Sequence, residues 1–398
     1  MKIKRTLLSA LAAILLLAGC GIKQTTPQNL SLKEAFGDKF LVGVALNTRQ
    51  VAGKDSAATR LIKRHFNSIV AENCMKSVNI HPEEGRYNFG AADSIVEYGE
   101  KNGMAVIGHC LIWHSQCAPW FCVDKEGKNV SPDIMKQRMK EHITTVVNRY
   151  KGRIKGWDVV NEAISGGGND GEGFYVLQSA SNAGADAANN FYWQDYLGSE
   201  DYVRIVVAAA RKYYAENGGV KPLKLFINDY NLESTWDNNQ KAKSLVHWIE
   251  KWESDGVTKI DGIGTQMHVA YRANAADQQK QEEHVVKMFE ILAKSGKLVK
   301  VSELDMGYVD ESGTTVLTKD MTEEQHKAMA EYYKFIVKKY FEIIPVAQQY
   351  GITQWCATDA PGAPGDSNWR GGEPVGLWDS NYNRKHTYAG FADGLAGK

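Results

Sequence analysis

The sequence has no excess of charge of either sign, since its 398 residues include 47 Lys and Arg against 47 Asp and Glu. Nucleic-acid binders depend on a surplus of Lys and Arg, so this balance argues against a nucleic-acid partner and favours a neutral one. The sequence also lacks the paired Cys-x-x-Cys and His-Glu-x-x-His patterns of metal sites. His109 and His114 alone do not indicate a metal, and we expect neither a metal nor a cofactor.

The N-terminal apolar run is too short to span a bilayer and is predicted to be a targeting segment. Three basic residues precede Leu7–Ala18, and the run closes on Leu17-Ala18-Gly19-Cys20. This tetrad resembles the lipobox of bacterial lipoproteins, in which the cysteine is acylated. We therefore predict a signal peptide over residues 1–19 and a lipidated tether over 20–34. The protein would cross the inner membrane and be anchored, periplasmic or at the cell surface, by lipid on Cys20; plain secretion with a free thiol is the alternative.

Five further cysteines cannot all pair within the chain, because their number is odd; they are Cys74, Cys110, Cys117, Cys122 and Cys356. Cys117 and Cys122 lie close together in the sequence and could bridge a loop. The spacing leaves both the bridged and the free state open.

From about residue 35, short apolar runs alternate with amphipathic stretches. The predicted strands are Phe40–Leu46, Ser68–Ala71, Ala105–His109, Gly156–Val160, Leu223–Ile227, Ile260–Thr265, Leu298–Ser302 and Gly351–Trp355. The predicted helices include Ala91–Asn102, Tyr202–Tyr214, Asn239–Trp252 and Gln278–Ala293. Two more helices have clear starts: Ser131 caps Pro132, and Thr322 with Gln325 forms a capping box.

Eight strand candidates alternating with helices indicate the α/β class, and a single (β/α)₈ TIM barrel over residues 35–396 rather than two doubly wound domains. The Gly- and Asn-rich stretch Ser165–Asn190 has no clear period. We predict a long loop there, after the fourth strand, where barrel enzymes place variable substrate walls.

Seven of the eight apolar runs turn polar or aromatic at their carboxyl ends, which a barrel brings to one face. In chain order these residues are Glu72, Asn73, Lys76, His109, Trp113, His114, Gln116, Asn161, Glu162, Asn228, Asp229, Tyr230, Asn231, Gln266, His268, Glu303, Asp305, Trp355 and Asp359. Trp113 or Tyr230 alone would more often be core packing than a sugar platform. Packing alone does not explain seven coincident ends, so we predict that Trp113 and Tyr230 bind substrate.

Glu162 and Glu303 follow strands that stand almost opposite one another in an eight-membered ring. Two converging carboxyl groups suit displacement at an acetal carbon, where one protonates the leaving oxygen and the other attacks. A separation of about 5–5.5 Å gives retention, and about 6.5–9.5 Å gives inversion. His268 and Asp305 are placed to hold Glu303 ionised, and Gln266 could bond either carboxylate.

The remaining polar and aromatic strand-end residues suit sugar binding. Asn161 can donate to the hydroxyl next to the reacting carbon. Trp113, Trp355 and Trp369 offer flat faces that match pyranose rings. The side chains left free to bind hydroxyls are Glu72, Asn73, Lys76 and Gln116.

Five segments form a pattern along the chain: Glu72-Asn73-x-Met75-Lys76, Gly108–Gln116, Trp157–Ala163, Asn228–Asn231 and Ser302–Asp305. Together they resemble glycoside hydrolase family 10, the endo-β-1,4-xylanases. They occur in the family's order, and the resemblance covers about residues 35–395.

The resemblance implies an endo-acting retaining enzyme that cleaves xylan through a covalent glycosyl-enzyme intermediate, with Glu162 as acid/base and Glu303 as nucleophile. It implies sugar binding by Glu72, Asn73, Lys76, His109, Trp113, Gln116 and Asn161. Gln266, His268 and Asp305 would serve the two carboxylates, and Trp355 would line the cleavage subsite. A monomer without a further carbohydrate-binding module is expected.

Two departures from the family pattern flank the expected cleft. The segment 360–368 separates Trp369 from Trp355, whereas in the family a second Trp follows closely, and Ser165–Asn190 exceeds the minimal length. Both could alter which xylan decorations are accepted. Two other functions stay in play: a catalytically silent barrel that only captures polysaccharide, and a related barrel that hydrolyses mannan or cellulose.

Overall fold

The computed structural model describes residues 30–36, 40–216, 223–359 and 369–397. The predicted signal peptide, Cys20 and most of the predicted tether lie outside the described residues. Within them, no helix combines the length and the apolar character that crossing a membrane requires.

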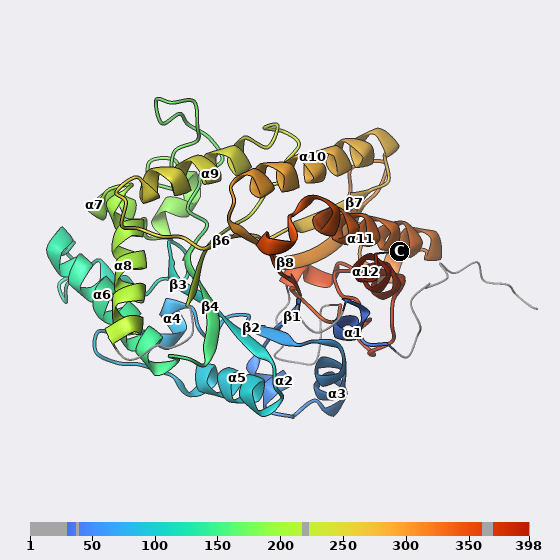
Figure 1. The fold of residues 1–398 in the computed structure, drawn as a ribbon, viewed down its shortest axis with the longest axis horizontal. Coiled ribbons are helices and arrows are strands. Elements are labelled where there is room, and N and C mark those ends of the chain that lie inside the picture. The colour runs from blue at the N-terminus through green and yellow to red at the C-terminus, as the bar shows by residue number, and fades with distance from the viewer. Residues whose placement is uncertain (1–29, 37–39, 217–222, 360–368, 398) are drawn as a thin grey trace, which may run out of the picture.

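A closed barrel of parallel strands forms the centre of the molecule (Figure 1). Its strands are β1 Leu41–Leu46, β2 Ser68–Ala71, β3 Ala105–Trp113, β4 Ile154–Asn161, β5 Lys224–Asp229, β6 Gly262–Thr265, β8 Leu298–Val309 and β9 Gln349–Gln354. Pairing of β6 with β8, and of β9 with β1, closes the ring. Strand residues are buried almost throughout, because helices cover the barrel's outer face. The predicted single (β/α)₈ barrel is confirmed.

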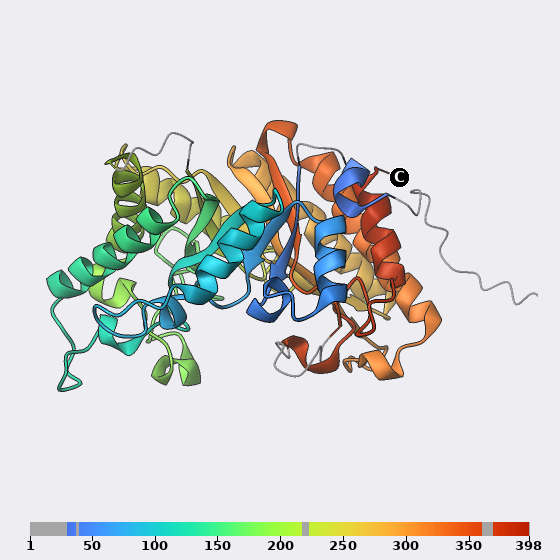
Figure 2. The ribbon, with the colours of Figure 1, turned by 90° about the horizontal axis from the view of Figure 1, so that it is seen from below.

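Helices surround the barrel in both views (Figures 1 and 2). The helices with at least ten residues are α3 Ser56–His65, α5 Gly90–Lys101, α6 Pro132–Arg149, α8 Asp201–Glu216, α9 Gln240–Glu253, α10 Ala275–Lys294, α11 Glu323–Ile343 and α12 His386–Leu395. Shorter helices are α1 Leu32–Phe36, α2 Thr48–Val51, α4 Ser77–Ile80 and α7 Gln194–Leu197. Both predicted helix starts are confirmed: Ser131 Oγ accepts from the Ile134 N–H, and the Thr322–Gln325 capping box is present.

One strand was not predicted, and β3 and β8 run well past their predicted ends. β7, His268–Arg272, pairs only with the outer half of β8, in a register that sets His268 beside Asp305. This extra ladder carries β8 on to Val309, beyond the predicted end at Ser302. Glu303 and Asp305 therefore lie inside a strand rather than just after one.

The predicted 165–190 loop contains no α-helix and is anchored to α9. The Tyr175 N–H donates to Ser244 Oγ (2.9 Å), and Gln240 Nε2 donates to Gly173 O (2.9 Å). The Phe174 ring stacks on His247 with centroids 4.0 Å apart. The loop is thus a packed wall beside the end of β4.

All five cysteines in the described ranges are free thiols, so Cys117 and Cys122 are not bridged in this structure. Burial raises the pKa of the Cys117 thiol to about 12. A thiol held in this protonated form is a poor nucleophile for disulfide exchange.

Candidate active site

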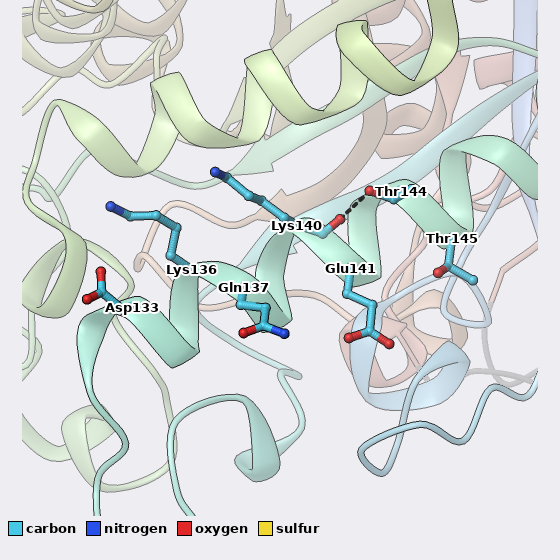
Figure 3. A pocket seen from close by; sticks show the side chains of 7 residues that line it. All are labelled: Asp133, Lys136, Gln137, Lys140, Glu141, Thr144 and Thr145. Carbon is cyan, nitrogen blue, oxygen red and sulfur yellow. Dashed lines mark hydrogen bonds between the residues drawn. The ribbon is translucent and has the colours of Figure 1, made fainter. Parts of the chain in front are cut away.

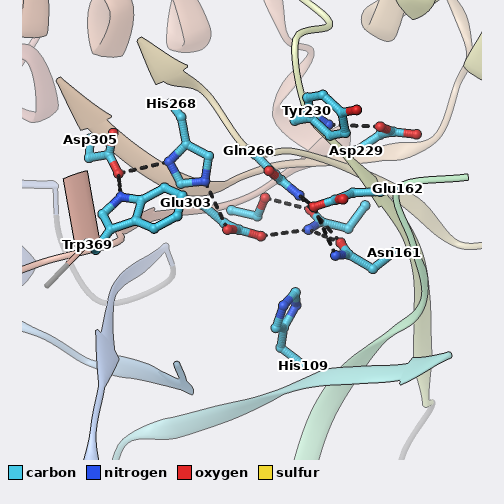
Figure 4. Close-up of polar contacts among 12 residues, drawn as sticks. His109, Asn161, Glu162, Asp229, Tyr230, Gln266, His268, Glu303, Asp305 and Trp369 are labelled. Carbon is cyan, nitrogen blue, oxygen red and sulfur yellow. Dashed lines mark hydrogen bonds and ion pairs between the residues drawn. The ribbon is translucent and has the colours of Figure 1, made fainter. Parts of the chain in front are cut away.

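A pocket of about 160 Å³ opens at the carboxyl ends of the barrel strands. Nearly all the predicted site residues line it: Glu72, Asn73, Lys76, His109, Trp113, Gln116, Asn161, Glu162, Gln266, His268, Glu303, Trp355 and Trp369. Trp369 is among them despite the longer segment that precedes it. Figure 4 shows the polar contacts that connect the two carboxyl groups and their supports.

Glu162 follows β4 directly, at the point where the backbone leaves the sheet. Its N–H donates to Asn228 O (2.7 Å), and its φ of 56° lies in the left-handed region, which a non-glycine residue rarely occupies. Its carboxyl accepts from Gln266 Nε2 (2.9 Å) and Trp113 Nε1 (3.0 Å). Burial raises the pKa of Glu162, and the nearby carboxylates Asp229 and Glu303 raise it further, although the Gln266 hydrogen bond opposes them. Glu162 is therefore suited to hold a proton.

Glu303 has the opposite surroundings. Burial alone would raise its pKa, but the hydrogen bond from His268 and the nearby His109 hold the pKa below its ordinary value. His268 Nε2 lies 3.1 Å from Glu303 Oε2, and Asn228 Nδ2 donates to Oε1 at 2.8 Å. Glu303 is therefore suited to remain an anion beside Glu162 in one pocket.

His268 lies between two carboxylates, as Figure 4 shows. Its Nδ1 lies 2.8 Å from Asp305 Oδ2, and its Nε2 faces Glu303. Burial would lower the pKa of His268, but Asp305, and then Glu303, raises it to about 10. His268 is thus an imidazolium that donates to both carboxylates.

Two amides join the carboxyl groups across the pocket. Asn228 Nδ2 donates both to Glu303 and to Asn161 Oδ1 (2.8 Å), and Asn161 Nδ2 donates to Glu162 Oε1 (3.2 Å). Ser302 Oγ donates to Asn228 Oδ1 (2.6 Å) and so fixes the orientation of that amide. The sequence places Asn228 at a strand end and in the Asn228–Asn231 motif, but it does not indicate the contact with Glu303.

One end of the pocket carries cationic and amide groups suited to sugar hydroxyls. Lys76 Nζ donates to Asn73 Oδ1 (2.8 Å) and lies 5.0 Å from the centroid of the Trp113 ring. His109 Nδ1 lies 3.0 Å from the buried Asp158 carboxylate, which leaves the other ring nitrogen for a ligand. These groups fit the predicted role of the glycone side.

Two predicted site residues are not part of the pocket lining within the described chain. Asp305 is fully buried behind His268. The Tyr230 ring lies against Lys241 Nζ, 3.3 Å from its centroid, and its hydroxyl accepts from Gln178 Nε2 (3.3 Å). Tyr230 therefore supports the 165–190 loop, and its predicted contact with sugar stays a prediction.

Two other features of the described chain resemble sites. Figure 3 shows a larger hollow along α6, of about 570 Å³, lined by Asp133, Lys136, Gln137, Lys140, Glu141, Thr144 and Thr145. This lining contains no aromatic ring, so it offers no platform for a sugar. Asp170, Glu172 and His247 have the spacing of metal ligands, but Lys251 Nζ lies 3.0 Å from Glu172, so the group is already an ion-pair network.

The barrel and its pocket define the class of protein. Two buried carboxyl groups with opposite pKa shifts face a space walled by tryptophans and hydroxyl-binding side chains. Such a pair at the carboxyl end of a (β/α)₈ barrel is the machinery of a glycosidase.

The sequence profile of glycosyl hydrolase family 10 matches residues 31–394. The chain belongs to this family, which confirms the predicted resemblance. It is accordingly a retaining glycoside hydrolase of the endo-1,4-β-xylanase type.

Named relatives and solved structures agree. Endo-1,4-beta-xylanase A of Xylanibacter ruminicola is 30% identical over 394 residues, covering 94% of each chain. An endo-1,4-beta-xylanase/feruloyl esterase of the same species is 37% identical over 71% of this chain, but the chain spans only 36% of that relative. The structure of a family 10 protein from Paenibacillus barcinonensis superposes with a TM-score of 0.75 at 30% identity, covering 92% and 97% of the two chains. A mutant xylanase 10C of Cellvibrio japonicus, solved with xylopentaose, gives 0.74 at 28% identity, covering 92% and 69%.

Proposed function

We propose that this enzyme cleaves internal β-1,4-xylosidic bonds of xylan by double displacement through a covalent glycosyl-enzyme intermediate. The observation that carries the proposal is the pairing of Glu162, whose pKa is raised, with Glu303, whose pKa is lowered, in one pocket. The names of the relatives support xylan as the substrate.

In the first step, a Glu303 oxygen attacks the anomeric carbon while the bond to the leaving oxygen breaks. Glu162 gives its proton to that oxygen, so that the shortened chain leaves as an alcohol. In the second step, Glu162, now a carboxylate, takes a proton from water. The water oxygen attacks the anomeric carbon and releases Glu303, which restores both groups. Two inversions give net retention.

Neighbouring residues stabilise the ionised form of Glu303 and place an amide between the two carboxyl groups. The His268 imidazolium stabilises the Glu303 anion, and Asn228 fixes the other oxygen of that carboxylate. Asn161 lies between the two carboxyl groups, where its amide can donate to the hydroxyl beside the reacting carbon. Such a bond strengthens as positive charge develops on the sugar ring.

Comparison of three polysaccharides tests the proposal. We expect the purified protein to release reducing ends from xylan much faster than from mannan or carboxymethyl cellulose, with a rapid fall in viscosity that marks internal cuts. Faster action on mannan or cellulose would indicate the related-barrel alternative. Binding of xylan without any release of reducing ends, at any pH, would indicate the silent binder.

Lys76→Ala is expected to weaken glycone binding more than it harms the chemistry. Loss of the ammonium beside Asn73 should raise KM for xylo-oligosaccharides about 10-fold, while kcat on a short aryl glycoside stays within about threefold of wild type. Steady-state kinetics on both substrates measure the split. Lys140→Ala, on the outer face of α6, is the matched control and should change neither constant. Equal losses on both substrates would contradict the assignment of Lys76.

We also propose that Cys20 is lipidated and anchors the enzyme to a membrane, as its sequence context indicates. Cys20→Ser should move the activity from the membrane fraction to the soluble fraction without changing kcat on xylan, which fractionation and assay together measure. Soluble wild-type protein would favour plain secretion instead.

A further inference from the structure

Two side chains that follow β9 reach the carboxylate behind His268. Trp369 Nε1 donates to Asp305 Oδ2 (2.6 Å), and Arg370 Nη1 donates to Asp305 Oδ1 (2.6 Å). With His268 on Oδ2, the fully buried Asp305 side chain accepts from three donors, so its orientation is fixed.

Arg370 is itself held from two sides. Its Nη1 also donates to Val269 O on β7 (2.9 Å), and its Nη2 donates to Glu373 Oε2 (2.8 Å). β8 makes room for this pair through Gly307: a Cβ there would lie 2.2 Å from Glu373 Oε2 and 2.4 Å from Arg370 Nη2. The planar fork of arginine suits such a site, because it can bind several acceptors in fixed directions.

We propose that Arg370 is a positioning residue for the nucleophile, acting through Asp305 and His268. Arg370 locks the Asp305 carboxylate, Asp305 holds the imidazolium, and the imidazolium donates to Glu303. This inference rests on the proposed role of Glu303. It adds a second cation, outside the pocket lining, to the charges that keep the nucleophile ionised.

Arg370, Asp305, His268 and Glu303 form a row of contacts. Whether removing the Arg370 charge raises or lowers the pKa of Glu303 depends on all the charged and titratable groups around this row. Besides these four residues, the groups with an electrostatic influence are His109 and Cys110 on β3, Glu162 after β4, Glu233 after β5, Tyr333 on α11, and Cys356 and Glu373 after β9. Removing the Arg370 charge leaves Asp305, Glu373 and Glu303 with less positive charge near them. Protonation of Glu303 becomes easier, so its pKa rises. Removing the Glu373 charge acts in the opposite direction.

The pH dependence of kcat/KM on an activated aryl xylobioside tests the proposal, because its low-pH limb reports the nucleophile of the free enzyme. Arg370→Met should shift the low-pH limb of the profile to higher pH by roughly 0.5–1 unit. It should also lower kcat about 10–100-fold, with KM within about threefold of wild type. Arg370→Lys keeps the charge but not the fork, so the limb should stay in place while kcat falls. Glu373→Gln should move the limb to lower pH.

A control variant separates this role from a merely structural one, and a trapping experiment tests the proposed function on which the role depends. Arg153→Met removes an arginine that also pairs with a carboxylate, Glu100 (2.7 Å), but on the outside of the barrel, and should leave the profile unchanged. A fluorinated xylobioside that traps the intermediate should label Glu303 in the wild-type enzyme. An unlabelled wild type overturns the proposed function itself.

If the probe labels Glu303 in the wild-type enzyme but the low-pH limb does not move in Arg370→Met, only the inference about Arg370 is overturned. This holds even if the melting temperature of the variant falls. A limb that moves as far in Arg370→Lys as in Arg370→Met also overturns it. If Arg370→Met does not fold, Arg370→Lys and Glu373→Gln still decide the matter: shifts in the same direction for both would contradict the charge argument.

Discussion

Glu303→Ala is expected to lower turnover of xylan and of activated aryl glycosides alike, by at least about 10⁴-fold. Glu162 and Asp305 are poorly suited to replace it in forming the covalent intermediate, because the pKa of Glu162 is raised and Asp305 is buried behind His268. Rates on both substrates measure the loss. A good leaving group should not rescue this variant, since the bond to the enzyme still cannot form.

Glu100→Ala, which removes a surface carboxylate, is the control and should keep wild-type rates. Melting curves of both variants show whether the fold is intact. Turnover of the activated substrate by Glu303→Ala within about tenfold of wild type would rule out Glu303 as the nucleophile.

Glu162→Ala is expected to separate the two steps of the reaction. Xylan turnover should fall at least about 10³-fold, because an alkoxide leaves poorly without a proton, whereas an aryl glycoside with a good leaving group should still form the intermediate. The intermediate should then accumulate, since Glu162 also activates water. Azide needs no such activation, so adding it should restore turnover and yield a β-glycosyl azide. Lack of rescue, or an α-linked product, would contradict the assignment.

The pH profile offers a further check on Glu162. Glu303 must be ionised to attack and its pKa is lowered, so activity is lost as the pH falls through that pKa. Glu162 must be protonated to donate and its pKa is raised, so activity is lost as the pH rises through that pKa. In Glu162→Ala assayed with a good leaving group, the high-pH limb should disappear and the low-pH limb should remain.

The sequence was sufficient for the barrel and most of the pocket, because both follow from local patterns. Buried parallel strands read as short apolar runs, and barrel geometry brings their polar ends together. α12 was missed since its Gly390 and Gly394 weaken any helical pattern. Gly390 is needed there because a Cβ would lie 2.0 Å from Ala330 O on α11. The helix is thus stabilised by packing rather than by propensity.

Two other features could not be read from local sequence. β7 is short and half-exposed, and it exists only because β8 extends far enough to pair with it. Arg370 binds Asp305, which lies 65 positions away in the sequence, and no spacing connects the two. Contacts of this kind come from tertiary geometry, so single-sequence patterns carry no sign of them.

The two proposed catalytic carboxyl groups, Glu162 and Glu303, differ in how firmly the backbone holds them. The Glu303 N–H donates to Gln266 O (3.1 Å), and the next residue, Leu304, accepts from the Trp355 N–H (2.9 Å), so this stretch is tied to both neighbouring strands. Glu162 comes just after the last residue of β4, its N–H bonds to one neighbouring strand only (Asn228 O, 2.7 Å), and the chain then leaves for the 165–190 loop. A change in that loop should therefore displace Glu162 more readily than Glu303, so loop variants are expected to slow proton transfer before they impair formation of the covalent bond.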